Sequence, residues 1–367
     1  MATIRDVARV AGVSIATVSR VYNESTRVSE ETRKKVRTVA AKMDYWPNGA
    51  ARSLTTSRTH SLGVLLPDLY GEFFSEVIRG IDQAARREKY QILVSSSHAD
   101  DEALIAAARS MHGRIDGLIA MAPDAASTAA IKQIAKSFPV VLLNPRVEVE
   151  GCGAISIANY DGSHSMVRHL LSLGHRRIAM LSGPAGNVDS EERVRGYRAA
   201  LREAGIPLDK RLELTGDFTE SSGYARASDI MALKPRPTAI FAANDNMAIG
   251  LLSALREASL RVPEDIAVTG FDNIAISRYV TPALTTVNVD AYELGDRAVM
   301  QWLGRLGANA REPVKHEILA ATLVVRRSCG STLPHSVGGE PNRVRRAASA
   351  QSVQAVGGKR RSRKQPG

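Results

Sequence analysis

The stretch TIRDVARVAGVSIATVSRVY, residues 3–22, predicts two short helices joined by a tight turn. Thr3 is placed to cap the first helix, and Gly12 can take the positive φ that a turn between helices requires. The apolar face of the first helix repeats at helical spacing through Ile4, Val7, Ala8 and Ala11. In a helix-turn-helix the second helix enters the major groove of DNA. The pattern therefore predicts an all-α DNA-binding domain over residues 1–46.

The second helix of this unit has small polar residues at its start. Ser14 can cap it, and Val18 and Val21 face the core. The side chains left for its outer face are Ile15, Ala16, Thr17, Ser19 and Arg20. Ser29 can open a third helix that completes a small core. A helical bundle without a ligand is the alternative, but the turn glycine, the helix lengths and the outer face together favour DNA binding.

Residues 47–60 predict a hinge helix followed by a linker. Pro47 ends any helix before it, and Asn48 can cap a new one that extends to Leu54. A helix this short is unstable alone, so we expect it to form only against a partner surface. Minor-groove proteins insert apolar side chains between base steps; Leu54 is placed for this, and the small Ala51 permits close approach. A plain linker with an incidental leucine is the alternative.

From residue 61 to residue 330, short apolar runs alternate with helical stretches. Runs such as SLGVLLPD, DGLIAMAP and TAIFAAND are nearly continuous in apolar residues, which is typical of parallel strands covered on both faces. The repeat is too long for one doubly wound unit, and two lobes with a cleft between them fit better. We therefore predict an N-terminal all-α helix-turn-helix headpiece plus a two-lobed α/β domain, similar to the periplasmic sugar-binding proteins.

The segments TIRDVARVAGVSIATVSRVYN, VSEETRKKV and YWPNGAARSL resemble the headpiece of the lactose/galactose repressor family of bacterial transcription regulators, and the resemblance extends to about residue 327. It implies a homodimer that binds a pseudo-palindromic stretch of double-stranded operator DNA. It also implies a first lobe of about 61–160 with 290–320, and a second of about 161–288 with the final strand. The DNA contacts expected are Thr3, Ser14, Ile15, Ala16, Thr17, Ser19, Arg20, Asn23, Asn48, Ala51 and Leu54.

Ligands of open α/β sheets bind beyond the carboxyl ends of the strands. The residues there that match the effector cleft of the family are Phe73, Phe74, Asp161, Arg193, Phe218, Asn244 and Asp272. Arg193 offers a fork of donors for hydroxyls or a carboxylate, and phenylalanines pack on a sugar ring or a flat base. For any one of these residues, a loop cap or a structural salt bridge is the alternative. We expect Asp245 to cap the helix that follows it.

The resemblance favours a sugar or sugar derivative as the effector, with a purine or nucleoside as the second choice. Ala158, Val289 and Ala291 depart from contacts that many relatives carry, which leaves the effector open. A sugar-binding transport protein would have the same lobes, but it would need an export signal and no DNA-binding headpiece. The N-terminus MATIRDVARV lacks the apolar run of a signal peptide, so we expect a cytoplasmic protein without a membrane span.

The net charge of +11 lies at the two ends of the chain. It is +6 over residues 1–60 and +8 over 341–367, which leaves −3 for the body between them. Cations near the headpiece fit phosphate contacts. Residues 331–367 have few large apolar residues and predict a disordered basic tail, which is either merely solvated or attracted to DNA of any sequence.

The chain shows no pattern of a catalytic or metal site. It contains no GxxxxGK[ST], GxSxG or HExxH, and Cys152 and Cys329 have neither metal-ligand nor disulfide-framework spacing. The glycine-rich run GPAGN at 183–187 has the wrong spacing for a nucleotide loop and predicts a turn. We therefore expect no enzyme activity, no cofactor and no metal.

Overall fold

A computed structural model of the protein describes residues 2–23, 26–46, 58–98, 100–121, 127–306 and 316–331. Three predicted DNA contacts in the hinge, Asn48, Ala51 and Leu54, lie outside the described residues, as does the tail from residue 332. Within these ranges no helix combines the length and apolarity needed to cross a membrane.

The N-terminal domain consists of three helices, α1 (Ile4–Ala11), α2 (Ile15–Tyr22) and α3 (Glu30–Lys42). Thr3 caps α1 reciprocally, because its N–H donates to Asp6 Oδ2 (3.0 Å) while the Asp6 N–H donates to Thr3 Oγ1 (3.3 Å). Gly12 turns the chain with φ 64°. The helices share a core of Val7, Ala8, Ala11, Val18, Val21, Val36 and Ala40. The predicted helix-turn-helix is confirmed.

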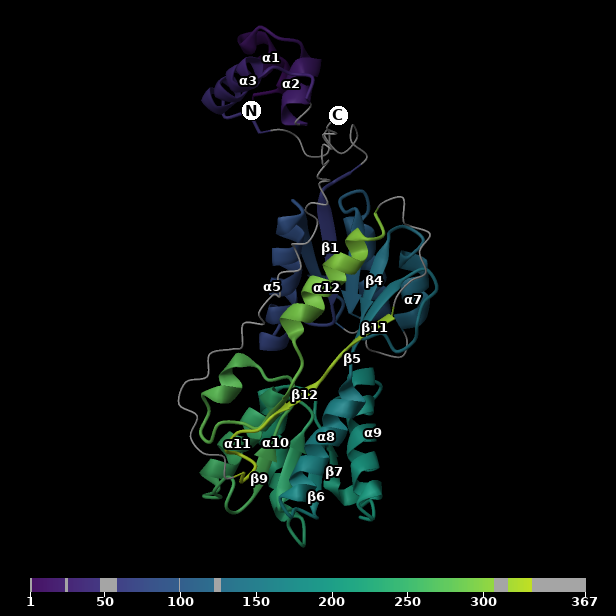
Figure 1. Ribbon diagram of the computed structural model, residues 1–367, viewed down its shortest axis with the longest axis vertical. Coiled ribbons are helices and arrows are strands. Elements are labelled where there is room, and N and C mark those ends of the chain that lie inside the picture. Colours follow the sequence, from purple (N-terminus) through teal and green to yellow (C-terminus); the bar gives the residue numbers. More distant parts are fainter. Residues whose placement is uncertain are drawn as a thin grey trace, which may run out of the picture. The chain divides into compact units, whose positions relative to one another are not determined.

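The first lobe is built on a six-stranded parallel sheet with the order β11-β5-β4-β3-β1-β2. Its strands are β1 (Ser61–Leu66), β2 (Gln91–Ser96), β3 (Gly117–Met121), β4 (Val140–Leu143), β5 (Gly153–Ile157) and β11 (His316–Leu319). Alternate residues of β1 pack into different core clusters, which places helices on both faces. Figure 1 shows α5 and α12 side by side on one of these faces; the covering helices are α5 (Glu72–Arg87), α6 (Asp101–Met111), α7 (Ser127–Ile134) and α12 (Ala291–Leu303).

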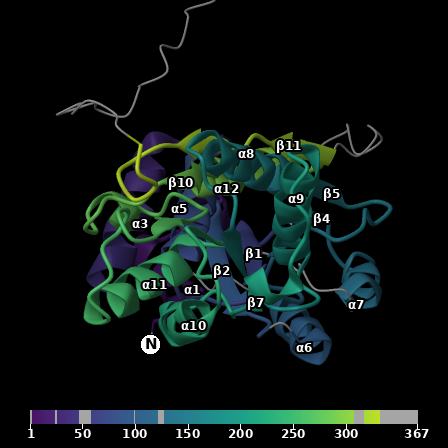
Figure 2. The same ribbon diagram turned by 90° about the horizontal axis from the view of Figure 1, so that it is seen from below.

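The second lobe has a four-stranded parallel sheet with the order β7-β6-β8-β9. Its strands are β6 (Ile178–Ser182), β7 (Glu213–Thr215), β8 (Ala239–Ala242) and β9 (Ala267–Thr269). Figure 2 shows α8 beside α9 and α10 beside α11; these helices are α8 (Asn159–Ser172), α9 (Val188–Glu203), α10 (Glu220–Ala232) and α11 (Asp245–Glu257). The predicted fold class, a helical headpiece plus a two-lobed α/β domain, is confirmed.

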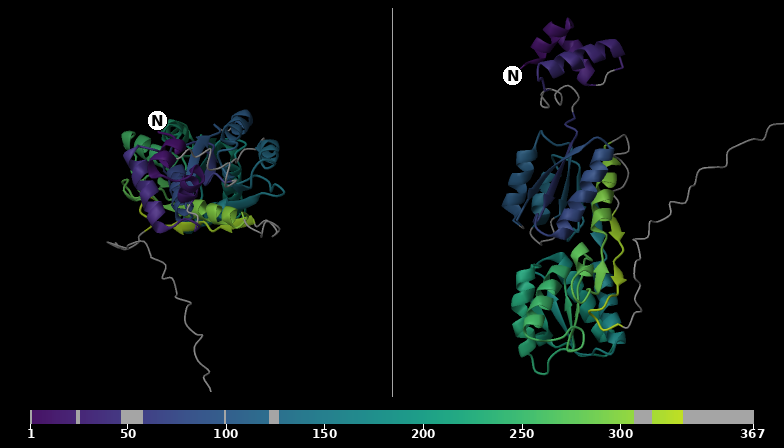
Figure 3. Two further views of the ribbon diagram at one scale, coloured as in Figure 1. Left: turned by 90° about the horizontal axis from the view of Figure 1, so that it is seen from above. Right: turned by 90° about the vertical axis from the view of Figure 1, so that its left-hand side faces the viewer.

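The chain passes between the two lobes three times. It crosses after β5, again between β10 (Thr286–Asn288) and α12, and last between β11 and β12 (Thr322–Val324). β10 and β12 pair antiparallel beside the second sheet. In the right-hand view of Figure 3 the yellow strands β11 and β12 run along one side of both lobes. The lobes are therefore joined by three neighbouring strand ends, an arrangement that permits hinge motion.

Helices α5 and α12 cross at glycines. A Cβ atom on Gly80 would lie 2.1 Å from the carbonyl oxygen of Tyr292, and one on Gly295 would lie 2.2 Å from that of Val77. These distances are far inside van der Waals contact, so the two backbones can approach only because neither position carries a side chain. The crossing fixes α12, which covers β4 and β5.

The end of the linker is fastened to the first lobe by one carboxylate. Asp116 Oδ1 accepts hydrogen bonds from the Thr59 N–H (2.7 Å) and the Thr59 hydroxyl (2.8 Å), and Asp116 Oδ2 accepts from the His60 N–H (2.9 Å). Arg58 donates to the carbonyl oxygen of Leu306, just beyond α12. Asp116 immediately precedes β3, so the linker enters the body at the start of a central strand.

Candidate nucleic-acid interface and ligand cleft

Helix α2 has an exposed face whose side chains are largely available to a binding partner. Ser14 caps the helix by accepting from the Thr17 N–H (3.0 Å), and the two hydroxyls lie 2.9 Å apart. Ile15 is 46% exposed, and Ala16 and Arg20 are also exposed. Apolar side chains this exposed at the start of a helix offer contact to thymine methyl groups rather than hydrogen bonds.

Arg20 is available to a partner. It has no hydrogen bond or ion pair within the described ranges, whereas Arg9 pairs with Asp6 (3.2 Å) and Arg33 with Glu30 (3.3 Å). A free guanidinium on the exposed side of the second helix can bond O6 and N7 of guanine together. The other predicted DNA contacts that are described differ in exposure: Thr3 and Ser14 are exposed, and Thr17, Ser19 and Asn23 are half-buried.

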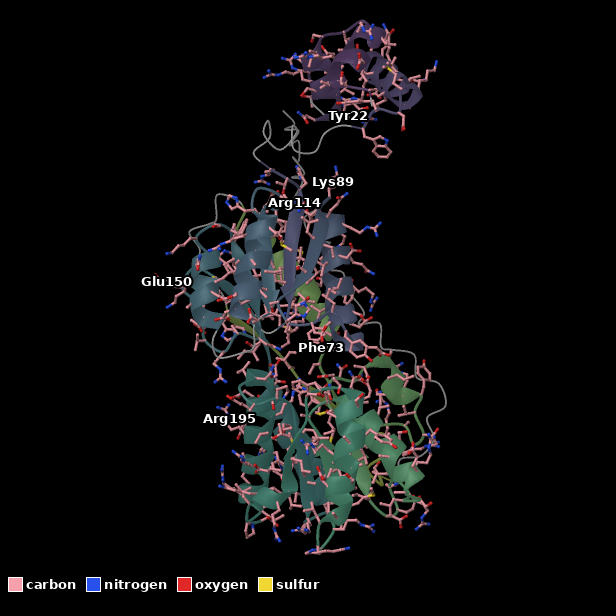
Figure 4. All side chains as sticks on the ribbon, turned by 180° about the vertical axis from the view of Figure 1, so that it is seen from behind. Tyr22, Phe73, Lys89, Arg114, Glu150 and Arg195 are labelled. Atoms are coloured by element: carbon pink, nitrogen blue, oxygen red, sulfur yellow. The ribbon has the colours of Figure 1, made fainter. Side chains whose placement is uncertain are left out.

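A cavity of about 420 Å³ lies between the two lobes, in the size range of small-molecule sites. Figure 4 shows Phe73, from the first turn of α5, at the end of the first lobe that faces the second. Its ring packs edge-on against that of Phe74, with centroids 5.4 Å apart. Six of the seven predicted effector residues line the cavity: Phe73, Phe74, Arg193, Phe218, Asn244 and Asp272.

Arg193 is the centre of a buried polar network on the cavity wall. Its Nε donates to Asn159 Oδ1 (2.8 Å), and its Nη1 donates to the carbonyl oxygen of Ala243. Its Nη2 lies 3.1 Å from Asp272 Oδ1, with the two side chains only 4% and 9% exposed. The guanidinium also lies over the ring of Phe271, 3.8 Å from the centroid. Protein atoms thus hold this guanidinium in place before any ligand arrives.

Asp189 extends the network into the first lobe. Its Oδ1 accepts from Asn159 Nδ2 (2.7 Å), and its Oδ2 accepts from Asn144 Nδ2 (3.2 Å). Asn144 follows β4 of the first lobe, whereas Asp189 lies in the first turn of α9 in the second. Asn144 Oδ1 in turn accepts from the Ile157 N–H (2.8 Å). One buried carboxylate therefore links residues from both lobes at the cleft.

Both the buried charge and the backbone conformation of Asp272 are energetically unfavourable. Burial raises its pKa to about 6, against the attraction of Arg193 and with a smaller contribution from the negative charge of Asp189. Its Oδ1 accepts no well-aligned hydrogen bond among the described residues. Its φ of 101° is a conformation that a non-glycine residue rarely adopts. Strain of this kind gathers at binding sites because the surrounding structure maintains it for function.

Phe218 and Asn244 are fixed against each other. Asn244 Nδ2 donates to the carbonyl oxygen of Phe218 (2.8 Å), and Phe218 has a φ of 70°. The phenylalanine ring fills the space beside Gly183, where a Cβ atom would lie 2.2 Å from the ring. The run GPAGN that contains Gly183 forms a turn, as predicted.

The predicted cap at Asp245 is wrong by one residue. Asn244 caps α11 by accepting from the Met247 N–H (3.0 Å), so its carbonyl oxygen is already used by the fold. Asp245 is fully buried, where it accepts from the Thr286 hydroxyl (2.6 Å) and from the Ile274 N–H (3.0 Å). Burial raises its pKa well above the ordinary value. Its role is structural, but it ties α11 to the segments beside it instead of capping the helix.

The prediction that Asp161 lines the cleft is wrong. Asp161 is exposed and does not border the cavity, whereas Asn159, two residues earlier, is buried in the Arg193 network. Both lie in the first turn of α8, where a separation of two residues turns a side chain by about 200° around the axis. Asn159, the first residue of α8, therefore faces inward, and Asp161 faces solvent.

The sequence reasoning missed Asn144, Asn159 and Asp189. Asn144 and Asn159 follow β4 and β5 almost directly, so the rule that ligands bind beyond strand ends would have found them. Asp189 precedes Arg193 by four residues on α9, which is the spacing of one helix face. No group of three or more His, Cys, Asp or Glu residues that could hold a metal ion occurs in the described part of the chain.

A helix-turn-helix with an exposed arginine, joined to two lobes that enclose a polar cleft, defines a ligand-responsive DNA-binding regulator. Residues 3–48 match the model of bacterial regulatory proteins of the lacI family, and residues 167–329 match that of a periplasmic binding protein-like domain. The ribose operon repressor of Escherichia coli (strain K12) is 33% identical over 312 residues, which cover 82% of this chain and 91% of that protein.

Two further comparisons cover nearly the whole of the proteins compared. The HTH-type transcriptional repressor PurR of Vibrio atlanticus (strain LGP32) is 34% identical over 91% of this chain and 100% of its own length. The crystal structure of the lac repressor dimer bound to operator and the anti-inducer ONPF superimposes with a TM-score of 0.80 at 32% identity, covering 89% of this chain and 99% of that one. The chain belongs to the lacI family of bacterial regulatory proteins.

Proposed function

We propose that this protein is a transcriptional repressor that binds a pseudo-palindromic operator as a homodimer and responds to a small molecule held between its lobes. The observation that carries the proposal is the presence, in one chain, of an exposed α2 face, where Arg20 has no partner among the described residues, and of a cavity walled by a buried polar network. The ligand would act by its different affinity for two arrangements of the lobes. No catalysis or cofactor forms part of the proposal, and the compartment proposed is the cytoplasm.

The DNA contacts proposed are Thr3, Ser14, Ile15, Ala16, Thr17, Ser19, Arg20 and Asn23, with Asn48, Ala51 and Leu54 of the hinge. The effector contacts proposed are Phe73, Phe74, Arg193, Phe218, Asn244 and Asp272. A sugar is the effector class proposed, supported by aromatic rings beside carboxylates and by similarity to a protein named ribose operon repressor. A nucleoside is the second candidate, because the same rings can stack on a flat base.

The test begins with selection of an operator from random duplex DNA by the full-length protein. Fluorescence anisotropy then measures the affinity of Arg20→Ala for the selected duplex and for random DNA. Arg9→Ala is the matched control, because it removes the same charge from α1, where the arginine pairs with Asp6. We expect Arg20→Ala to lose roughly 1–3 kcal/mol on the operator and little on random DNA. Equal losses on both DNAs, or equal behaviour of the two variants, would contradict the proposal.

A further inference from the structure

Exposed cations flank the point where the linker enters the first lobe. His60 is held there between two strands, because its carbonyl oxygen accepts from the Gln91 N–H (3.0 Å) at the start of β2 and its own N–H donates to Asp116 just before β3. Lys89 lies two residues before Gln91, and Arg114 lies two residues before Asp116. Figure 4 shows both cations at this end of the lobe.

The segments that lead into β2, β3 and β4 are strongly basic. They are residues 86–90, 109–116 and 135–139, and they hold six Lys or Arg against two Asp or Glu, a net charge of +4. The body of the chain is net negative, so its positive charge is concentrated here. Four of the six cations are exposed and have no side-chain hydrogen bond or ion pair within the described ranges; we call them the linker-end surface: Lys89, Arg109, Arg114 and Lys136.

The ends of helices attract positive charge, but this alone does not explain why the four cations lack partners. Each lies at or just beyond the carboxyl end of α5, α6 or α7, where cations are favoured. The helices of the second lobe also end in basic residues. There, however, Asp209 binds Arg177 (3.1 Å) and Arg211 (2.8 Å). The linker-end surface has no such carboxylate among the described residues, so its charge is available to an anionic partner.

We propose that the linker-end surface contacts the phosphate backbone of the duplex that the headpiece binds. The inference rests on the proposed DNA-binding function. Trp46 of the headpiece and Arg58 of the linker are 12 residue steps apart, which an extended chain spans in at most about 43 Å. The chain therefore tethers a duplex bound by the headpiece near these cations, which raises its effective concentration there. Phosphates carry the complementary charge.

Contacts between cations and phosphates have a measurable dependence on salt. Each phosphate contact adds about 0.9 to the slope of the logarithm of the binding constant against the logarithm of the salt concentration. Neutralising Lys89 and Arg114 should therefore lower this slope by about 1.8. Between about 50 and 200 mM salt, the affinity of the parent should fall about 12-fold more than that of the variant.

Fluorescence anisotropy on the full-length protein and its selected operator measures this slope for Lys89→Gln/Arg114→Gln. The matched control is Arg202→Gln/Lys210→Gln. It also removes one lysine and one arginine, which are exposed and without side-chain partners among the described residues, but from the end of the second lobe that faces away from the cleft. We expect the control to keep the slope of the parent. An unchanged slope in Lys89→Gln/Arg114→Gln, or equal changes in both double variants, overturns the inference.

A DNA-cleaving reagent tests the contact directly. The two native cysteines, Cys152 and Cys329, are buried, so a cysteine introduced at an exposed position can be labelled selectively with iron–EDTA, which cuts only nearby DNA. We expect labelled Arg114→Cys to cut the bound duplex and labelled Lys210→Cys to leave it intact. Absence of cleavage by labelled Arg114→Cys overturns the inference even where the salt slope has changed.

The experiments separate this inference from the function on which it rests. If the protein selects an operator and Arg20→Ala loses that preference, but Lys89→Gln/Arg114→Gln keeps the salt slope of the parent, the proposed function holds and only the linker-end surface is wrong. If the full-length protein prefers no duplex sequence over another, the proposed function fails, and this inference fails with it.

Discussion

Replacing Asp272 with asparagine should make the protein more stable at neutral and alkaline pH while impairing the cleft. The carboxylate has a pKa of about 6 in the folded protein and 3.8 in the unfolded chain. The folded state therefore holds the proton more firmly. Stability is unaffected below about pH 3.8, falls as the pH rises towards 6, and stays reduced above it. A difference of about 2.2 pKa units corresponds to about 3 kcal/mol.

Asparagine has nearly the shape of the protonated acid and carries no charge, so Asp272→Asn should lack this loss. Asp245 adds to the effect in the same direction, because repulsion by Asp272 contributes to its raised pKa. At pH 8 we expect the free energy of unfolding of the variant to exceed that of the parent by about 3 kcal/mol. At pH 4 the two free energies should be nearly equal. Asp272 would then be a residue that lowers the stability of the folded protein while it forms part of the proposed binding site.

The assay is urea unfolding followed by circular dichroism at several pH values between 4 and 8, at one fixed protein concentration because dimerisation contributes to stability. Asp161→Asn, on an exposed helix face, is the control and should follow the parent at every pH. Parallel pH profiles for the parent and Asp272→Asn would refute the reasoning. A variant less stable than the parent at pH 8 would show that the ion pair with Arg193 outweighs burial.

Three further outcomes can be measured. Gly80→Ala should lower the free energy of unfolding by about 1–3 kcal/mol, because the added methyl group forces α5 away from α12. The control Arg86→Ala, at an exposed position, should change the free energy of unfolding by less than about 0.5 kcal/mol. Similar values for the two variants would contradict the tight crossing. Asp116→Ala should weaken operator binding and the response to effector while calorimetry shows unchanged effector affinity; a fall in that affinity would mean a general structural defect. Residues 331–367 carry a net charge of +7. Deleting them should flatten the dependence of the logarithm of the DNA-binding constant on the logarithm of the salt concentration, for any DNA. An unchanged slope would show that the tail does not touch DNA.

Local signals in the sequence were sufficient for the headpiece. Thr3, Gly12 and Ser14 make their capping and turn hydrogen bonds with residues only three or four positions away. The caps and the turn could therefore be predicted from spacing alone. The two parallel sheets also followed from apolar runs, because strands buried on both faces leave a strong pattern. The rule on strand ends, together with the family resemblance, then led to six of the residues that line the cavity.

Features that depend on contacts between distant segments were beyond the sequence. The hydrogen bond between Asn144 and Asp189 joins residues 45 positions apart in different lobes, and no local pattern announces it. The side chain that joins the Arg193 network at the start of α8 depends on where the helix begins, which decided between Asn159 and Asp161. The pairing of Arg193 with a protein carboxylate could not be predicted either, because its partner Asp272 lies 79 residues later in the chain.

Strand β3 has a different residue of interest at each end. Met121, its last residue, borders the cavity, and Asp116, directly before its first residue, binds the end of the linker. The five residue steps from Asp116 to Met121 span about 16 Å at about 3.3 Å each, and neighbouring strands hydrogen-bond β3 on both sides. Such a strand is hard to stretch or bend, so a displacement at the Met121 end reaches Thr59 with little loss. One wall of the proposed effector cavity and the anchor of the linker are two ends of one stiff segment.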